Sequence, residues 1–384
     1  MPKRKSGIAL LALNWYAGKI ASPVPRLRFL IFAMYPRSRD EPGRLPQIKA
    51  GLLIAFPVTL FLFTAPVAPR TPQAAQSRSA PLPNRVSVRV ATASQIWQVE
   101  TSGAFETYSN GLRIDTRYSV AGRPRSWLAY SAVRPEPARS ERRTSPAGIV
   151  FHTTESQQAP FEPGQNSRLG RIGEWLLAHV KQRRAYNYVI DRFGRVYRVV
   201  AEDDAANHAG YSVWADSRWV YINLNQSFLA VSFETETLPG QSEATVNPAQ
   251  LWSGAMLTEM LRDRYGILAE DCVTHAQVSV NPSGLRIGSH FDWASSFPFG
   301  QIGLPDNYQL PLPAITLFGF EYDSAFAEQA GERLFREAQL TEQTLLNRAT
   351  AAGLEPFVYR KSLQQQYRRL TASHRTPDPE EQEE

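Results

Sequence analysis

Gly148-Ile-Val-Phe-His152 is an apolar run that ends in a histidine. Its shortness and its glycine boundary predict a buried strand. Cys272-Val-Thr274 is a second short run of this kind, and His275 follows it directly. A sheet that contains both runs can aim the two imidazoles into one open pocket. Such a pocket can hold a metal ion and leave one coordination position for water.

The residues between these two runs alternate between helix and strand patterns. Apolar residues recur at helical spacing from Leu169 to Val180. Residues 186–190 and 194–200 predict two strands of a hairpin, joined by a turn at Asp191-Arg-Phe-Gly194. Residues 229–234 alternate apolar and polar side chains, which predicts a strand with one apolar and one polar face.

A second helix is expected before the Cys272 run. Asn247 is its predicted N-cap, Pro248 lies in its first turn, Gln250 completes a capping box and Gly266 ends it. The side chains expected in its apolar interior are Trp252, Met256, Leu257, Met260 and Leu261. The elements together predict an α/β fold with a central mixed β-sheet flanked by helices.

Several short motifs resemble those of a known family. They are Gly148–His152, Ala185-Tyr-Asn-Tyr-Val-Ile190, Asn207-His-Ala-Gly210, Leu229-Ala-Val-Ser-Phe-Glu234, Thr274-His275 and Phe291-Asp-Trp293. In their order and spacing, residues from about 147 to 299 resemble the N-acetylmuramoyl-L-alanine amidase type 2 family, which includes the peptidoglycan-recognition proteins and the phage amidase lysozymes. The resemblance implies a mixed sheet with helices and one zinc ion in a surface groove. It also implies hydrolysis of the amide between the lactyl group of N-acetylmuramic acid and L-alanine in peptidoglycan.

The resemblance also implies roles for individual residues. His152 and His275 match zinc ligands, and Tyr186 matches a catalytic tyrosine that contacts the attacking water or the developing oxyanion. His208 matches a histidine of the groove, so we expect it and Asn187 to contact the substrate.

The third zinc ligand departs from the family pattern. The family has an Asp or Cys before a Pro-Gly pair at this point, whereas this chain has Leu285-Arg-Ile-Gly288, and an arginine does not bind zinc. We expect His290 to supply the ligand, with Asp292 as the alternative. Both follow Gly288 in a loop that could fold back, and both carry an atom that zinc accepts.

A second departure concerns the proton-transfer group. Ser232 stands where some members of the family have a catalytic glutamate, and Glu234 points to the same face of the predicted strand. We expect Glu234, or alternatively His208, to pass a proton to the departing amine.

The charge of the chain is unevenly distributed. The formal net charge is +6, but residues 1–50 hold ten Lys or Arg residues against Asp40 and Glu41, so the remainder is slightly acidic. A nucleic-acid partner, which would need a basic patch on the folded part, is therefore not expected. Cys272 is the sole cysteine, which excludes an intramolecular disulfide and predicts a small buried side chain.

Residues 51–67 form an uncharged apolar run near the lower length limit for crossing a membrane. Two interpretations remain open, a membrane anchor and the core of a cleaved signal sequence. The basic residues before the run place that side in the cytoplasm. The folded part is then expected outside the cytoplasm, in the periplasm or cell envelope, either anchored to the membrane or secreted.

The remaining segments complete the predicted organisation. Residues 68–84 are a linker, and residues 85–145 predict a small β-rich lead-in to the zinc amidase domain at 146–312. Residues 313–375 predict a helical extension, and residues 376–384 an acidic disordered tail. His179 and His374 carry no context that links them to chemistry. The sequence makes no prediction of oligomeric state.

Two functional classes follow from this pattern. The leading one is a zinc hydrolase that cuts peptidoglycan or muropeptides. The alternative is a module of the same fold that binds muropeptides without cutting them, which the irregular third-ligand motif keeps open.

Overall fold

The computed structural model describes residues 95–323 and 325–372. The predictions for residues 1–84 and 376–384, which include the apolar run at 51–67, lie outside these residues. No helix in the described ranges is both long and apolar enough to cross a membrane.

The central sheet has eight strands in the order β1-β2-β3-β9-β8-β13-β7-β14. Its middle is parallel, because β13 pairs in parallel with both β8 and β7, and β7 with β14. The hairpin of β8 and β9 is antiparallel, so the sheet is mixed as predicted. The strands of this part are β7 (Gly148–Thr153), β8 (Tyr188–Ile190), β9 (Val196–Arg198), β13 (Phe228–Phe233) and β14 (Cys272–Thr274).

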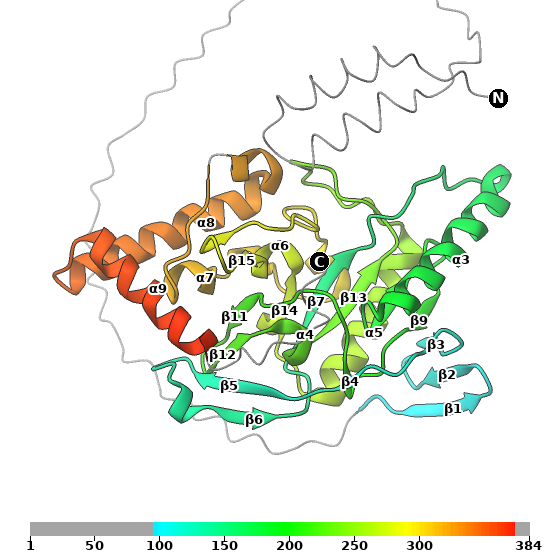
Figure 1. The fold of residues 1–384 in the computed structure, drawn as a ribbon. Coiled ribbons are helices and arrows are strands. Elements are labelled where there is room, and N and C mark those ends of the chain that lie inside the picture. The colour runs from blue at the N-terminus through cyan, green and yellow to red at the C-terminus, as the bar shows by residue number, and fades with distance from the viewer. Residues whose placement is uncertain (1–94, 324, 373–384) are drawn as a thin grey trace, which may run out of the picture. The chain divides into compact units, whose positions relative to one another are not determined.

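One long helix covers each face of this sheet (Figure 1). α5 (Pro248–Tyr265) begins at the predicted capping box and ends at Gly266, and its Leu257 and Leu261 pack against Phe151 of β7. α3 (Asn166–Arg183) covers the other face, where its apolar side chains pack on β8. The predicted α/β class is confirmed.

The lead-in is part of this fold and not a separate small sheet. β1 (Gln98–Ser102), β2 (Phe105–Tyr108) and β3 (Arg113–Asp115) extend the central sheet, because β3 pairs with β9. β5 (Trp127–Ser131) and β6 (Glu141–Arg143) join β11 (Val213–Ala215) and β12 (Trp219–Ile222) in a four-stranded sheet. β4 (Arg123–Pro124) pairs with β10 (Asp204–Ala205).

One sequence expectation about burial is wrong. Trp252 is 70% exposed, since the buried side of α5 carries Gln250, Ser253 and Gly254 instead. The polar side of β13 is buried like its apolar side, and Ser232 is fully buried.

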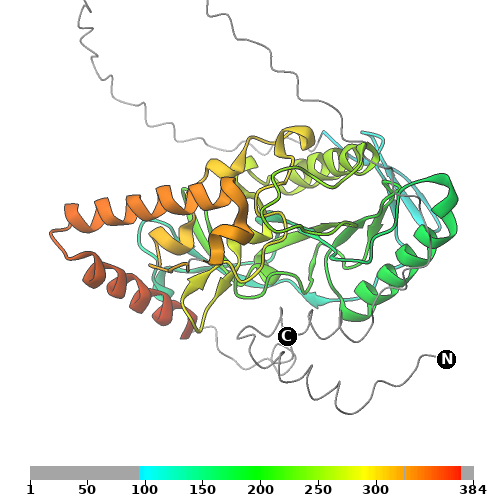
Figure 2. The ribbon, with the colours of Figure 1, turned by 90° about the horizontal axis from the view of Figure 1, so that it is seen from above.

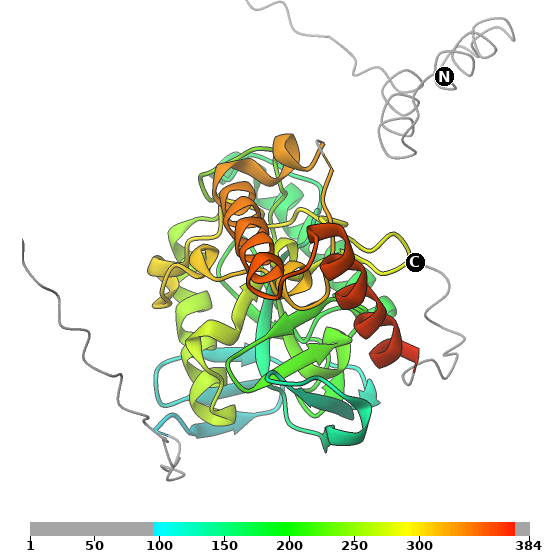
Figure 3. The same ribbon diagram turned by 90° about the vertical axis from the view of Figure 1, so that its left-hand side faces the viewer.

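The helical extension consists of α8 (Ala325–Ala351) and α9 (Pro356–Ala372). The two helices run antiparallel, side by side, at one end of the molecule (Figures 2 and 3). They follow the short helix α7 (Pro313–Thr316) and share a core with the four-stranded sheet, in which Leu334 and Tyr367 pack with Val213 and Val220. The extension therefore packs against the four-stranded sheet.

Candidate metal centre and its surroundings

His152 lies near the carboxyl end of β7, on the sheet face opposite α5. Its neighbour Phe151 packs in the α5 core, and successive side chains of a strand point to opposite faces. In the parallel register, His152 stands beside Ser232 of β13. Its side chain is 2% exposed, so the imidazole is almost fully removed from water.

His275 is the first residue of the short helix α6 (His275–Val278), which follows β14 directly. Thr274 forms a capping box with Gln277, which fixes the turn from strand to helix. Because β14 and β7 are parallel neighbours with Thr274 opposite Phe151, His275 comes out at the same sheet edge as His152. The ring centroids of the two histidines are 4.5 Å apart.

Asp292 reaches the two histidines through a β-hairpin that follows α6. The hairpin strands are β15 (Val280–Asn281) and β16 (Arg286–Ile287). Ser279 closes the loop, since its carbonyl accepts from Gly288 N and its hydroxyl from His290 N. The chain thus folds back to α6, where the N–H of Ala276 donates to the carbonyl of Asp292.

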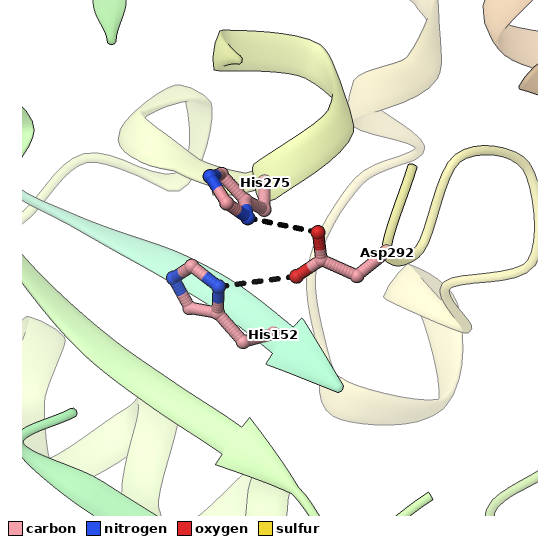
Figure 4. A group of neighbouring side chains, drawn as sticks. All are labelled: His152, His275 and Asp292. Carbon is pink, nitrogen blue, oxygen red and sulfur yellow. Dashed lines mark hydrogen bonds and ion pairs between the residues drawn. The ribbon is translucent and has the colours of Figure 1, made fainter. Parts of the chain in front are cut away.

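The three side chains form a compact group of potential metal ligands (Figure 4). Nδ1 of His152 is 3.1 Å from Oδ2 of Asp292, and Nδ1 of His275 is 2.8 Å from Oδ1. One atom from each residue lies within 4.8 Å of the others. Two imidazole nitrogens and one carboxylate oxygen are a donor set that suits a divalent metal with one open position.

The electrostatics of the group also suit metal binding. Burial, and then the nearby His275, lower the pKa of His152 to about 4, so its ring is neutral at physiological pH. Burial opposes ionisation of Asp292, but the charge of His275 and the hydrogen bonds from both histidines outweigh it and hold its pKa well below the usual range. A neutral His152 and an ionised Asp292 are the states of these two groups that bind a metal.

His290, the first choice from the sequence for the third ligand, lies outside this group. Its ring stacks on His275 with centroids 4.5 Å apart and planes inclined by 20°. The geometry thus places the alternative, Asp292, in the third position. The sequence could not rank the two because the length and path of the hairpin decide which residue reaches the histidines.

Tyr186 lies beside the group, as predicted. Its ring centroid is 5.1 Å from that of His152. Its φ is +61°, a left-handed conformation that is uncommon for a bulky side chain. Hydrogen bonds between residues 184–186 and Asn207 hold the backbone at this point. A costly conformation that is fixed next to potential metal ligands is typical of a functional residue.

His208 contacts His152 directly. Its Nδ1 lies 3.1 Å from Nε2 of His152, on the side of that ring that faces away from Asp292. Its Nε2 lies 3.1 Å from the carbonyl oxygen of Leu224. Both ring nitrogens of His208 are therefore engaged within the protein, which the expected contact with substrate did not anticipate.

Asn187 does not face the group. It is fully buried, its Oδ1 accepts from Ala230 N, and its Nδ2 donates to the carbonyls of Val200 and Ala201. The amide connects β13 to the chain that follows β9. Its role is structural, and the expectation that it contacts substrate is not met.

Glu234 lies at the end of β13 and faces α3. Its Oε2 accepts from the N–H of Arg192. The same oxygen lies next to Gly173 of α3, since a Cβ built on that glycine would be 4.0 Å away. Burial raises its pKa. Its Oε1 and the hydroxyl of Ser232 have no hydrogen-bond partner in the described part of the chain.

A pocket of about 670 Å³ opens beside the loop that follows His152. Its walls are the segment Thr154–Gln157 and one side of α3. Arg168, Arg171 and Trp175 of α3 line it and are exposed. Trp175 stacks on His179, with ring centroids 5.4 Å apart. Arg168, Arg171 and Trp175 were not predicted as site residues, although an exposed tryptophan and two arginines on one helix face are a recognisable binding pattern.

Comparison with known proteins agrees with this geometry. Residues 142–286 match the family model described as N-acetylmuramoyl-L-alanine amidase. This part of the chain is an amidase family domain. It includes His152, Tyr186 and His275, whereas Asp292 lies just beyond the matched residues. None of the curated proteins gives a significant match.

Several solved structures resemble the amidase domain. The N-acetylmuramoyl-L-alanine amidase LysC from Clostridium intestinale is 22% identical, with 41% of this chain and 83% of LysC covered and a TM-score of 0.27. The amidase AmiD from E. coli, solved with the substrate anhydro-N-acetylmuramic acid-L-Ala-D-gamma-Glu-L-Lys, is 18% identical over 71% of this chain and 98% of AmiD, with a TM-score of 0.34. AmpDh3 from Pseudomonas aeruginosa is 18% identical over 52% of this chain and 83% of AmpDh3, with a TM-score of 0.33.

Proposed function

We propose that this protein is a zinc-dependent N-acetylmuramoyl-L-alanine amidase. Its substrate is the amide that joins the lactyl group of N-acetylmuramic acid to L-alanine in peptidoglycan or muropeptides. The observation that carries the proposal is the group of His152, His275 and Asp292, which converge at one sheet edge. Both histidines lie within the residues that match the amidase family.

The donor set fits zinc better than magnesium or calcium. Zinc accepts imidazole nitrogen and carboxylate oxygen in a four-coordinate site, whereas the other two ions prefer sites built from oxygen. Nδ1 of His152, Nδ1 of His275 and a carboxylate oxygen of Asp292 would hold the ion. When bound, zinc lowers the pKa of a coordinated water to about 7 and polarises a carbonyl oxygen.

We propose that Tyr186 stabilises the negative charge that develops on the carbonyl oxygen of the substrate. Its ring lies beside His152, so its phenol can donate a hydrogen bond at the reacting centre. Glu234 is the proposed source of the proton for the departing amine, because burial raises its pKa and so favours the protonated acid.

The pocket beside α3 is the proposed place for the stem peptide. It begins at Thr154, two residues after His152, and Arg168 and Arg171 line it. Stem peptides carry free carboxylates, which arginine binds with paired hydrogen bonds. Trp175 offers an exposed apolar surface for the aliphatic parts of the peptide.

We further propose that the amidase domain works outside the cytoplasm, with residues 51–67 as anchor or signal sequence. The basic residues before that run support this orientation. A reporter fused at the carboxyl end of the chain tests it, since alkaline phosphatase activity is expected there and a cytoplasmic reporter should stay inactive.

Metal analysis and a peptidoglycan digest together test the main proposal. We expect about one zinc per chain in the full-length protein, and much less in His152→Ala. Mass spectrometry of the digest should show stem peptides with a free L-alanine amine. A protein that binds muropeptides but releases no such peptides, with zinc supplied, would instead be the binding module of the same fold.

A further inference from the structure

One short helical turn holds His208 in a fixed position. This turn is α4 (Leu224–Ser227), which precedes β13. The carbonyl oxygen of Leu224 lies 3.1 Å from Nε2 of His208. The side-chain oxygen of Asn225 accepts from three consecutive main-chain N–H groups, those of residues 208–210. Both the ring and the backbone of His208 are therefore tied to the same turn.

A buried arginine in turn holds α4. Arg125 is 2% exposed and donates to the carbonyls of Gln226 and Phe228, at 2.8 and 2.9 Å. It also donates to the carbonyls of Glu202 and Asp204. A guanidinium engaged with four carbonyls, buried and away from solvent, fixes the turn against the lead-in strands.

The contacts of His208 favour one position for each proton. A carbonyl oxygen only accepts, so the Nε2 of His208 that faces Leu224 carries the N–H. The Nδ1 of a neutral His208 then has only a lone pair, and it faces Nε2 of His152. A metal on Nδ1 of His152 would leave the proton of that ring on Nε2, where Nδ1 of His208 can accept it.

The proton on Nε2 of His152 also determines what the opposite nitrogen, Nδ1, presents to its neighbours. With its proton on Nε2, a neutral His152 presents the lone pair of Nδ1 toward Asp292. The carboxylate of Asp292 favours the other tautomer, in which Nδ1–H donates to it, and His208 acts against this preference. Metal-binding imidazoles commonly have the second nitrogen fixed in this way by a hydrogen-bond acceptor.

We propose that His208 is a positioning residue that sets the tautomer of His152 and so directs Nδ1 of His152 to the metal. The relay runs from the carbonyl of Leu224 through His208 to His152. This inference rests on the zinc site of the proposed function. It gives His208 a role in metal binding instead of substrate contact.

Zinc affinity of the full-length protein gives the first test. His208→Phe keeps a ring in place but removes both hydrogen bonds. Loss of such an outer partner typically weakens metal binding about 10–100-fold, and we expect this change in a competition with a zinc chelator. His208→Asn, whose side-chain oxygen lies near the position of Nδ1, should recover part of the affinity. Thermal unfolding shows whether each variant is folded.

The tautomer itself gives the second test, which needs no activity. Long-range 1H–15N spectra of the zinc-free protein distinguish the two N–H positions of a histidine ring. We expect a larger share of the Nε2–H form of His152 in the wild type than in His208→Phe. His179→Phe is the matched control, because His179 lies on α3 without contact to the group in the described residues, and it should change neither measurement.

The results separate this inference from the proposed function. A wild type that binds no zinc or releases no peptide refutes the proposed function. A wild type that does both, while His208→Phe keeps normal zinc affinity and the wild-type share of the Nε2–H form and only raises KM, overturns the relay and returns His208 to substrate contact. Weaker zinc binding with near-normal KM at saturating zinc supports the relay.

Discussion

Nδ1 of His275 lies 2.8 Å from Oδ1 of Asp292, although a complete β-hairpin separates the two residues in the chain. The two side chains nevertheless meet, because the chain returns to α6 and closes on Ser279.

Asp292→Ala should lose zinc. Removing a direct donor should weaken binding more than the roughly 10–100-fold that loss of an outer partner causes, and hydrolysis should disappear with the metal. Equilibrium dialysis with metal analysis measures the effect. His290→Ala is the control, since that ring stacks on His275 without joining the group, and it should keep zinc. The reverse pattern would make His290 the third donor.

Tyr186→Phe should reduce kcat and leave zinc bound. Removing one hydrogen-bond donor to a developing oxyanion costs about 10²–10³ in rate. Steady-state kinetics on a soluble muropeptide, combined with metal analysis, measure both effects. A variant with full turnover excludes the phenol from the chemistry.

Tyr186→Gly separates function from stability at the same position. The left-handed φ of +61° costs a tyrosine about 1 kcal/mol that a glycine does not lose. We therefore expect an inactive protein whose unfolding free energy falls by less than the loss of a large side chain usually causes. Denaturant unfolding beside Tyr186→Ala, which lacks the ring but keeps the Cβ, gives the comparison. Equal stability of the two variants would contradict a strained backbone.

Replacing Arg168 and Arg171 together by alanine should raise KM for substrates with charged stem peptides. One charge-assisted hydrogen bond contributes about 1.5–3 kcal/mol, so a change of at least about tenfold is expected, with kcat nearly unchanged. Arg183→Ala, at the far end of α3, is the control. If substrates with amidated stem peptides suffer equally, the arginines do not bind carboxylates.

The stability of the fold should fall as pH rises toward 8 because of Asp271. Burial, and then the neighbouring Asp216 and Glu270, raise its pKa to about 8, and its Oδ1 accepts from Trp214 Nε1 at 3.2 Å. The folded state favours the protonated acid, so the unfolded state loses its proton first and stability declines between about pH 4 and 8. Each unit of pKa difference corresponds to about 1.4 kcal/mol.

Asp271→Asn tests this directly. The asparagine keeps an oxygen that can accept from Trp214, but it cannot ionise. The melting temperature of the variant, compared with that of the wild type, should therefore rise as pH increases. Melting curves of both proteins from pH 5 to 8 measure the difference. A constant difference across that range would show that Asp271 does not titrate in it.

The parts of the site that follow local rules could be predicted from the sequence. His152 and His275 each follow a short buried strand, and the capping box at Asn247 fixed the start of α5. These signals depend on neighbouring residues, which a sequence displays directly. The helices near 325–351 and 356–372 likewise followed from apolar spacing.

The parts that depend on long-range packing could not be predicted. Asp292 reaches the histidines only because of the hairpin and its closure at Ser279. The contact of His208 with His152 depends on α4, a turn that leaves no pattern in the sequence. Trp252 was placed in a core because α5 carries apolar residues on more than one side, and the periodicity alone did not identify the side that packs.

The hairpin that carries Asp292 also touches the C-terminal helices. Gly288 lies so close to Phe326 of α8 that a Cβ there would clash with its ring. Ser295, three residues after Asp292, accepts from Leu334 N and donates to Ala330 O, both in α8. The C-terminal extension thus supports the loop that carries Asp292. A polypeptide that stopped before α8 would keep both imidazoles yet lose the rigid support of its carboxylate, so a truncated form should be a poor zinc binder even though the family-matching residues remain whole.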